Sequence, residues 1–523
     1  MLKKEKKRNI KAFLAIVLVM ILVSSIFFVY FEFYSEEEVE EEKVYNKNID
    51  DRISPLAPQA LFLEVHRIRK KGIIDVMLNS GPKIANILPR NTHMWSYLDG
   101  LFPGKNWQDK PTFNYIVILD DFEYINAQGF NTWDSGYINR QVFKKVEEEK
   151  ENAVVSISFI ENEKKKLKTV EREVEGFTVQ YDFKTGRWNG DDYFNDSDGY
   201  GHYDGDVFEM WFTISQTNYD ADNIPYWTEV NILHTNPRID DSKSDPDKDG
   251  IPTSWEWKWG YDPFRWNNHS YLDPDKDGLQ NDEEYLMRKW LANPYYPEIY
   301  IEVDFMEKTP FKLFNKDLDG QEHVFYEESQ QMLIDRFNEY GITVHIDDGI
   351  MGGGGEYLPL ILDKISQEDG TASEFYHNNF ADERKGIFRY LFIDHWGGWC
   401  HPQDDKHWYD TMAVPSAREF YFKYLGGAVS KRSQIIGRAV QVLHELGHSL
   451  GLRPEEWKGI DNMTYGGTTW ADYKSAMNYY YFALRVFDYS DGSRGEPYDR
   501  NDWEKIDLSY FQRTADEMEG LGS

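Results

Sequence analysis

Cysteine is nearly absent from the chain, because Cys400 is the only one among 523 residues. A single cysteine excludes an intrachain disulfide. Basic residues are also few, with 58 Lys and Arg against 91 Asp and Glu and a formal net charge of -33. Binding to nucleic-acid phosphates requires clustered Lys and Arg, so this balance argues against a nucleic-acid partner. Dense carboxylates favour divalent cations, and calcium is the ion that we expect to brace the loops of an extracellular chain without disulfides.

The N-terminal segment contains 20 consecutive residues without a charge, from Ala12 to Phe31. A helix of this length spans the hydrocarbon core of a bilayer. Basic residues precede it and an acidic run follows, so the positive-inside rule places the N-terminus in the cytoplasm. We predict a cytoplasmic tail over residues 1–11, a single-pass anchor in the cell membrane over 12–34, and an acidic tether over 35–55. A cleaved signal peptide is the alternative, and it would make the protein secreted.

Residues 56–215 are predicted to form a β-rich, sandwich-like domain. Four stretches in it are rich in β-branched and aromatic residues, and Gly, Asn and Asp turns separate them. These stretches are 112–125, 153–161, 176–183 and 207–215. The sequence of this domain indicates no specific function.

Residues 216–296 contain an internal repeat whose units are 218–229, 245–256 and 273–284. The second and third units match the calcium-loop pattern D-x-D-x-D-G-x5-E. In that pattern three carboxylates converge on one ion, the glycine allows a sharp turn, and the final glutamate closes the shell. A solvated acidic linker is the alternative. The predicted calcium ligands are Asp245, Asp247, Asp249 and Glu256 in one loop and Asp273, Asp275, Asp277 and Glu284 in the other.

Two related stretches depart from the pattern. The first unit has Asn218 in place of the first Asp and Asn223 in place of the glycine. A further stretch, "NKDLDG" at 315–320, has Tyr326 at the twelfth position and is interpreted as a turn. The matching units resemble the calcium-binding thrombospondin type 3-like repeats of secreted prokaryotic proteins. That resemblance implies a spacer made rigid by calcium.

From residue 297 onward the pattern alternates between strands and helices, which predicts an α/β (α+β) domain over 297–523. Strands are expected over 298–306, 342–349 and 387–396. Helices are expected over 322–341, 430–451 and about 498–518. The protein as a whole is therefore predicted to be multidomain.

The helix predicted over 430–451 contains the motif His-Glu-x-x-His. His444 and His448 are four residues apart, so both imidazoles lie on one helix face and can bind one Zn²⁺. Glu445 beside them can act as general base toward water that zinc activates. Gly451 is placed to end the helix.

A catalytic zinc normally has three protein ligands, and the motif supplies two. The carboxylates that follow it are Glu455, Glu456, Asp461 and Asp472. Asp461 comes after a glycine on a loop long enough to fold back, so we predict Asp461 as the third ligand and Glu456 as the second choice. A neighbouring loop with His395, His401 and His407 could also donate a ligand.

Two landmarks together, "HELGHSLG" and the later "KSAMNYYYF" at 474–482, resemble the metzincin clan of zinc metalloproteases. The resemblance covers residues 297–510. It implies an endopeptidase with Met477 under the zinc and Tyr479 near the metal, where it stabilises the oxyanion. By the same likeness, 387–396 lies near the edge strand along which a peptide pairs. Pro454 stands where the clan has its third histidine, although some metzincins use aspartate as that ligand.

The first functional hypothesis is a membrane-anchored extracellular zinc endopeptidase that hydrolyses protein or peptide substrates, with Glu445 as general base. The alternative is a catalytically inactive, calcium-binding adhesion protein of the cell surface with a degenerate metzincin-like domain. Retention of Glu445 and Tyr479 beside both histidines favours the enzyme. A thermolysin-like zinc site, with a glutamate from 501–508, is a variant that keeps the function and changes the fold.

Overall fold

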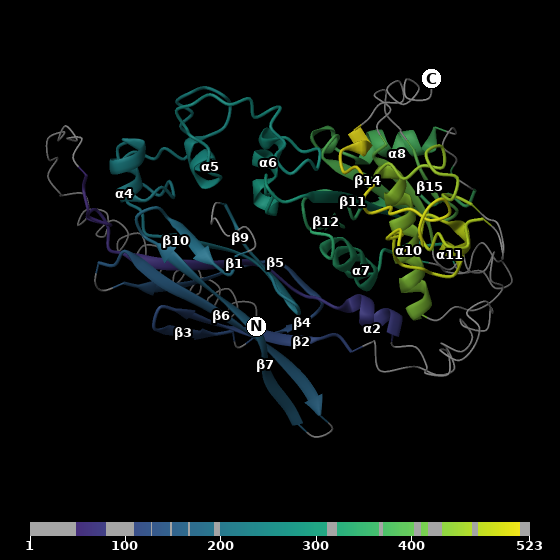
Figure 1. The fold of residues 1–523 in the computed structure, drawn as a ribbon, viewed down its shortest axis with the longest axis horizontal. Coiled ribbons are helices and arrows are strands. Elements are labelled where there is room, and N and C mark those ends of the chain that lie inside the picture. The colour runs from purple at the N-terminus through teal and green to yellow at the C-terminus, as the bar shows by residue number, and fades with distance from the viewer. Residues whose placement is uncertain are drawn as a thin grey trace, which may run out of the picture. The chain divides into compact units, whose positions relative to one another are not determined.

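The computed structural model describes residues 49–79, 109–126, 128–146, 149–165, 168–192, 199–310, 322–363, 365, 370–401, 409–416, 431–462 and 469–512. These ranges form a mixed α/β structure with three sheets (Figure 1). Asp51–Ser523 is one compact unit and Met1–Asp50 is another. Within the described ranges, none of the helices combines the length and the apolar character needed to cross a bilayer. The predicted tail and anchor over 1–34, and the tether as far as residue 48, lie outside them.

Two antiparallel sheets occupy residues 60–216 and share one hydrophobic core. Alternate side chains of β1, such as Leu61 and Leu63, meet Phe113 and Tyr115 of β2 in that core. Sheet A has the order β5-β1-β10-β9, and sheet B has the order β3-β2-β6-β7-β8 with β4 paired to β2. Their strands are β1 (Ala60–Lys70), β2 (Thr112–Leu119), β3 (Phe122–Ile125), β4 (Phe130–Asn131), β5 (Asp134–Lys145), β6 (Asn152–Lys165), β7 (Lys168–Asp182), β8 (Arg187–Gly190), β9 (Gly201–Asp204) and β10 (Phe208–Gln216).

The strand predicted over 112–125 is two strands in the structure. Asp120 adopts a left-handed φ of 59°, and the chain turns there between β2 and β3. Strands β1 and β5 were not predicted. Their Arg and Lys residues obscure the alternation, although Arg67 and Arg69 of β1 are buried.

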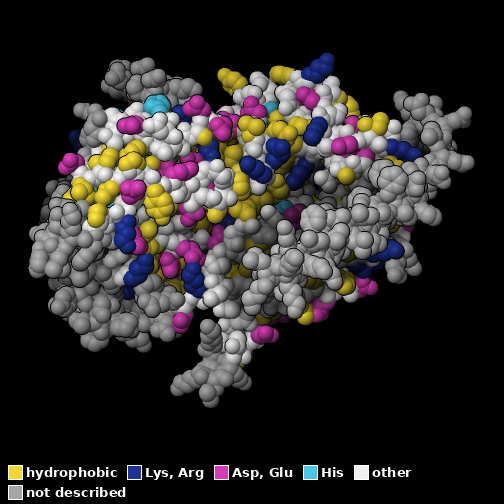
Figure 2. Space-filling view, turned by 180° about the vertical axis from the view of Figure 1, so that it is seen from behind, with side chains coloured by type: hydrophobic (Ala, Val, Ile, Leu, Met, Phe, Trp, Pro, Cys, Tyr) yellow, Lys and Arg dark blue, Asp and Glu magenta, His cyan; other side chains and the backbone are white. Residues whose placement is uncertain are grey.

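The repeat region forms three short helical segments, each of which begins at the ninth position of one repeat unit. They are α4 (Tyr226–Thr228) with the π-helix Glu229–Leu233, then α5 (Thr253–Lys258), then α6 (Asn281–Met287) with the 3-10 helix Arg288–Trp290. Figure 1 shows α4, α5 and α6 in succession beside the sheets. On the face seen in Figure 2, acidic side chains are interspersed with Lys, Arg and hydrophobic groups.

Sheet C forms the frame of the C-terminal part and has the order β12-β11-β14-β16-β15, with β13 paired to β11. Its pairings are parallel except that of β15, which is antiparallel to β16. Its central strands are buried on both faces, as a parallel sheet covered by helices requires. Its strands are β11 (Glu298–Met306), β12 (Thr343–Asp347), β13 (Tyr357–Leu358), β14 (Phe388–Asp394), β15 (Trp399–Cys400) and β16 (Thr411–Pro415).

Helices cover the two faces of sheet C. One face packs with α7 and α10, and Ile435, Ala439, Val442 and Leu446 of α10 form the predicted apolar stripe in that core. The other face packs with α8. The remaining elements of this part are α7 (Glu327–Asn338), α8 (Thr371–Asn379), the 3-10 helix Asp382–Arg384, α10 (Lys431–Ser449), α11 (Tyr479–Ala483) and the 3-10 helix Tyr510–Gln512.

The stretch predicted to lie near the edge strand forms β14 inside the sheet, and one strand, β16, separates it from the edge strand β15. One expectation for this part is wrong. Residues 498–509 form turns and loop instead of the start of a terminal helix, and 513–523 lie outside the described ranges. The loop conformation allows Asp502 to accept hydrogen bonds from Tyr473, Ser475 and Ser490.

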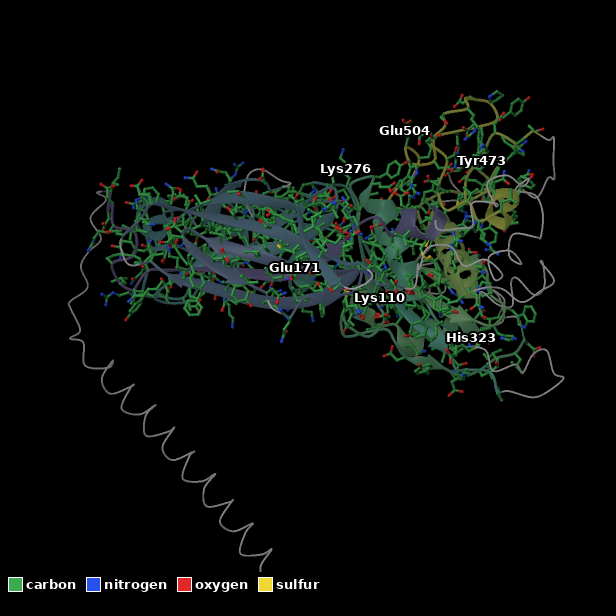
Figure 3. The ribbon with its side chains drawn as sticks, turned by 90° about the horizontal axis from the view of Figure 1, so that it is seen from below. Lys110, Glu171, Lys276, His323, Tyr473 and Glu504 are labelled. Atoms are coloured by element: carbon green, nitrogen blue, oxygen red, sulfur yellow. The ribbon has the colours of Figure 1, made fainter. Side chains whose placement is uncertain are left out.

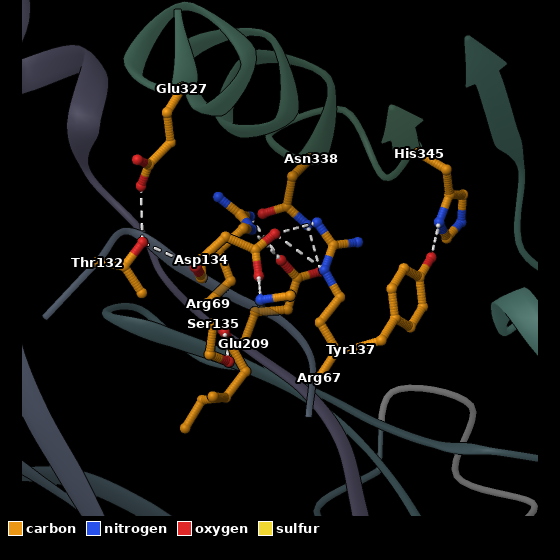
Figure 4. Close-up of polar contacts among 12 residues, drawn as sticks. Arg67, Arg69, Thr132, Asp134, Ser135, Tyr137, Glu209, Glu327, Asn338 and His345 are labelled. Carbon is orange, nitrogen blue, oxygen red and sulfur yellow. Dashed lines mark hydrogen bonds and ion pairs between the residues drawn. The ribbon is translucent and has the colours of Figure 1, made fainter. Parts of the chain in front are cut away.

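A buried polar network joins sheet A to helix α7 and strand β12 of the C-terminal part (Figure 4). Arg69 of β1 forms ion pairs with Glu209 of β10 and with Asp335 of α7. The second oxygen of Asp335 accepts the backbone N–H groups of Gly72 and Ile73, where helix α2 (Ile73–Asn79) begins. Because a buried charge is costly once its partner is removed, this network makes the two-sheet part integral to the fold of Asp51–Ser523.

Candidate metal centres

Helix α10 presents the three residues of the predicted zinc motif on one face near its C-terminal end. One ligand atom from each of His444, Glu445 and His448 lies within 4.8 Å of the other two. All three residues are buried. Gly451 follows the helix with a φ of +86°, the left-handed conformation that ends helices.

Hydrogen bonds to the backbone set the orientation of both imidazoles. His444 Nδ1 lies 2.9 Å from the carbonyl oxygen of Ala476, and His448 Nδ1 lies 2.8 Å from that of Leu452. A carbonyl can only accept, so each Nδ1 carries the hydrogen and donates it. Each neutral ring then has its lone pair on Nε2, which is the arrangement of a zinc-ligating histidine held by an outer carbonyl.

Asp461 is brought to both histidines by the loop after α10. Its Oδ1 lies 3.2 Å from His444 Nε2 and 3.6 Å from His448 Nε2. Its backbone N–H donates to the carbonyl of Met477 at 2.9 Å, and its φ is +55°. The structure thus places the predicted third ligand beside the first two.

The donor set of these residues fits a zinc ion. Asp461 Oδ1 is buried and has no hydrogen-bond partner among the described residues. With both histidines protonated on Nδ1, two nitrogen lone pairs and one carboxylate oxygen converge, and a cation is the group that satisfies all three. Before a metal binds, the Nε2 atoms that would ligate it can carry protons instead. Burial works to raise the pKa of Asp461, but the protonated forms of His444 and His448 outweigh it and hold that pKa well below its usual range. Asp461 is therefore an ionised ligand at neutral pH.

Met477 forms the floor beneath this triad, and a glycine of the helix makes room for it. A Cβ atom built on Gly447 would lie 2.4 Å from the sulfur of Met477. Met477 is fully buried, and its carbonyl is the acceptor that holds Asp461. Gly447 was not singled out from the sequence, which shows its position between the two histidines but not its contact with Met477.

Tyr479 and Glu445 lie at the sides of the triad. The ring of Tyr479 stacks on His444 with centroids 5.2 Å apart, and Phe482 contacts the same imidazole edge-on at 5.1 Å. Burial raises the pKa of Glu445, which makes its carboxylate a stronger proton acceptor. Gly398, just before edge strand β15, lies near the Glu445 carboxylate, since a Cβ built there would be 3.8 Å from Oε1.

The other ligand candidates lie elsewhere. Glu455, Glu456 and Asp472 are exposed. Glu504, the glutamate of the thermolysin-like variant, is also exposed (Figure 3). Among the described residues, the group on α10 that could hold a metal ion consists of His444, Glu445 and His448, and Asp461 is the loop carboxylate that lies beside both histidines. His395 pairs with His323 at 3.3 Å, and His407 lies outside the described ranges.

The second repeat unit brings its carboxylates together as predicted for a calcium loop. Ligand oxygens of Asp245, Asp247 and Asp249 lie within 4.8 Å of one another. Asp249 also groups with Glu256, which is fully buried with both carboxylate oxygens lacking a hydrogen-bond partner among the described residues. Burial raises the pKa of Glu256 to about 7. The buried ring of His269, which the sequence did not indicate, lies 3.2 Å from Asp249 and 3.6 Å from Glu256.

The third repeat unit forms the same loop and is joined to sheet C. Oxygens of Asp273, Asp275 and Asp277 again lie within 4.8 Å of one another, and both oxygens of the buried Glu284 have no partner in the described structure. Asp277 Oδ2 accepts the N–H of Glu298, the first residue of β11, at 2.8 Å. Burial raises the pKa of Asp275 to about 9. Carboxylates packed in this way need a cation to be ionised together.

A scan against models of protein families finds no match to this chain, and a search of the curated proteins finds none either. The functional assignment therefore depends on the side-chain geometry.

Proposed function

We propose that the protein is a membrane-anchored, extracellular, zinc-dependent endopeptidase with a metzincin-like catalytic part. The observation that carries this proposal is the convergence of His444 Nε2, His448 Nε2 and Asp461 Oδ1 beside the buried carboxylate of Glu445. Two histidines and one carboxylate are a donor set of catalytic zinc sites, which keep a further position open for water or substrate.

Zinc, when bound to this triad, would polarise the scissile carbonyl and lower the pKa of a water molecule to about 7. Glu445 accepts the proton of that water and delivers it to the leaving amine. Its raised pKa suits both steps, because a proton acceptor works best with a pKa near the operating pH. Tyr479 stacks on His444, and its hydroxyl is the candidate donor to the oxyanion.

The metzincin-like reading is supported by the arrangement around the helix as well as by the motif. Helix α10 covers sheet C, ends at the left-handed Gly451, and rests on Met477, which comes from a turn far along the chain. The departure from the clan is Asp461 in place of a third histidine. We assign the two matching repeat units to calcium, as rigid supports of the chain between the sheets and the catalytic part.

Zinc content and peptide hydrolysis test the proposal. We expect the full chain to hold one zinc at the triad and to cleave casein. Glu445→Gln should retain zinc and lower kcat by about 10²- to 10⁴-fold, because the general base is lost while the ligands remain. Glu456→Gln is the matched control and should change neither quantity, since Glu456 is exposed.

A wild-type chain that holds one zinc and cleaves no protein or peptide would refute the endopeptidase. That outcome would leave the inactive, calcium-binding surface protein as the assignment. N-terminal sequencing of the chain in the membrane fraction tests the anchor. An intact N-terminus is expected, whereas a chain that begins beyond residue 34 would show that the segment is a cleaved signal.

A further inference from the structure

The first repeat unit, 218–229, departs from the calcium pattern at two positions, yet its backbone follows the other two units. The fourth position is left-handed in all three, with φ of 64° at Ala221, 65° at Lys248 and 64° at Lys276. The sixth position is left-handed as well, and Asn223 adopts φ of 67° where the other units have glycine. Asparagine tolerates this conformation better than most residues, so its presence does not break the loop.

The hydrogen bonds around the fifth position also repeat. Asp222 Oδ1 accepts the N–H of Ile224 at 2.8 Å, as Asp249 and Asp277 do from the residues two positions after them. Asp222 Oδ2 accepts a later backbone N–H, from Asp241 at 3.3 Å, as its two counterparts accept from Asn267 and Glu298. The twelfth residue of each unit donates its N–H to the carbonyl of the eighth, which in this unit is Pro225.

Three carboxylate oxygens of this unit, two of Asp220 and one of Glu229, lack partners among the described residues, which the loop geometry alone does not explain. Glu229 is fully buried, and its Oε2 has no hydrogen-bond partner within the described part of the chain. Both oxygens of Asp220 are likewise buried and unpartnered. One oxygen from each of Asp220, Asp222 and Glu229 lies within 4.8 Å of the others, so the unpartnered atoms are directed at one point.

An ion-free cluster of this kind is unfavourable at neutral pH. Burial and the nearby charges of Asp222 and Asp220 raise the pKa of Glu229 to about 9, and burial with the charge of Asp222 raises that of Asp220 to about 6. The Glu229 carboxyl accepts one hydrogen bond, from Thr235 Oγ1 at 3.2 Å. A divalent cation at the cluster would satisfy the remaining oxygens and neutralise their charge.

We propose that residues 218–229 form a third calcium site, with carboxylate ligands from Asp220, Asp222 and Glu229. The ligands are oxygens only, which suits a hard cation such as calcium. Asn218 supplies a neutral amide where the other units have a carboxylate, and its Nδ2 lies 2.6 Å from Asp222 Oδ1 and 2.7 Å from the Ile224 carbonyl. The site therefore carries one negative charge fewer than the other two and is the weakest of the three.

Calcium stoichiometry of the full chain tests this site independently of zinc and of proteolysis. Equilibrium dialysis against calcium, followed by metal analysis, should find one calcium ion fewer in Glu229→Gln than in the wild type. Asp240→Asn is the matched control, because it removes the same charge from a neighbouring acid outside the cluster and should retain every ion. Equal calcium content in the wild type and Glu229→Gln would overturn the proposal.

A second variant decides the question if Glu229→Gln fails to fold. Asn218→Asp restores the carboxylate of the first position, so the weakest calcium-binding phase should tighten several-fold. Unchanged binding in that phase would contradict the site, since the added charge would then face no ion. A wild-type chain that shows no zinc-dependent cleavage but has the expected calcium count would argue against the endopeptidase and leave this site standing.

Discussion

The zinc triad and the calcium loops both gather carboxylates, but they balance charge in different ways. In the triad one carboxylate, Asp461, faces two imidazoles and is held ionised by them. In the loops three aspartates and a buried glutamate face one another, and burial raises the pKa of Glu256 and Asp275. The triad can therefore balance its charge with protons when no metal is bound, whereas we propose that each loop requires a cation to relieve repulsion and desolvation.

The largest effect is expected from replacing Asp461, the member of the triad of His444, His448 and Asp461 that comes from the loop after the helix. Asp461→Ala should weaken zinc binding by on the order of 100-fold or more, because two histidines alone leave the shell incomplete. Zinc retention after dialysis against a competing chelator measures this. If Asp461→Ala keeps its zinc through the same dialysis as the wild type, Asp461 is not a ligand.

A smaller effect, on the stability of the whole fold, is expected from removing calcium. At free calcium 100-fold above Kd, each loop contributes about 3 kcal/mol to the free energy of unfolding. Zinc removal should cost less, since the triad balances its own charges. Thermal unfolding after selective removal of each metal checks this, and equal losses of Tm would contradict the difference between the two regions.

The calcium-free protein should also lose stability as pH rises. A carboxyl group whose pKa is higher in the folded state than in the unfolded state stabilises at low pH, and this contribution is lost as pH passes through the folded value. The stabilising contribution of Glu256 is lost between about pH 4.5 and pH 7, and that of Asp275 continues to be lost up to about pH 9. The gain in Tm on adding calcium should therefore be larger at pH 8.5 than at pH 6.

The smallest effect distinguishes the two matching loops from each other. Gly250 and Gly278 occupy the same place in identical "DPDKDG" stretches, with φ of 102° and 96°. Alanine at either position incurs about 1–2 kcal/mol of left-handed strain. A Cβ at Gly278 would also lie 2.8 Å from Ser509 Cα, whereas one at Gly250 meets nothing within 4 Å. Gly278→Ala should therefore unfold at a lower denaturant concentration than Gly250→Ala. Equal unfolding midpoints for the two variants would contradict the packing of the third loop against Ser509.

Local patterns in the sequence predicted much of the site. The spacing of His444 and His448 defined a shared helix face, and the carboxylates of both calcium loops are close in sequence, so their convergence needed no tertiary information. Asp461 was chosen from several carboxylates because it follows a glycine on a loop long enough to fold back. The structure supplies the physical reason for its position, because the hydrogen bond from its N–H to the carbonyl of Met477 fixes the loop.

Other features could not be found from the sequence because they depend on pairs of residues far apart in the chain. Arg69 and Asp335 form an ion pair across 266 positions, and β1 was missed because its buried arginines resemble surface residues. The order of the strands in sheet C was not predicted, because strand order in a parallel sheet follows from packing and crossover connections. The need for a glycine at position 447 follows only from its contact with Met477, because a Cβ atom there would collide with the methionine sulfur.

The sequence by itself determined the charge, the helical His-Glu-x-x-His motif and the candidate ligands of two calcium-type loops, because these depend on residues within one or two turns of each other. Tertiary structure decided the position of Asp461 beside the histidines, the packing of Met477 against the helix, and the joint between the sheets and the C-terminal part. It also revealed the carboxylate cluster at 218–229, where two asparagines hide the pattern. Backbone conformation and burial, which decide whether a carboxylate needs a cation, are set by the folded chain and not by the identity of single residues.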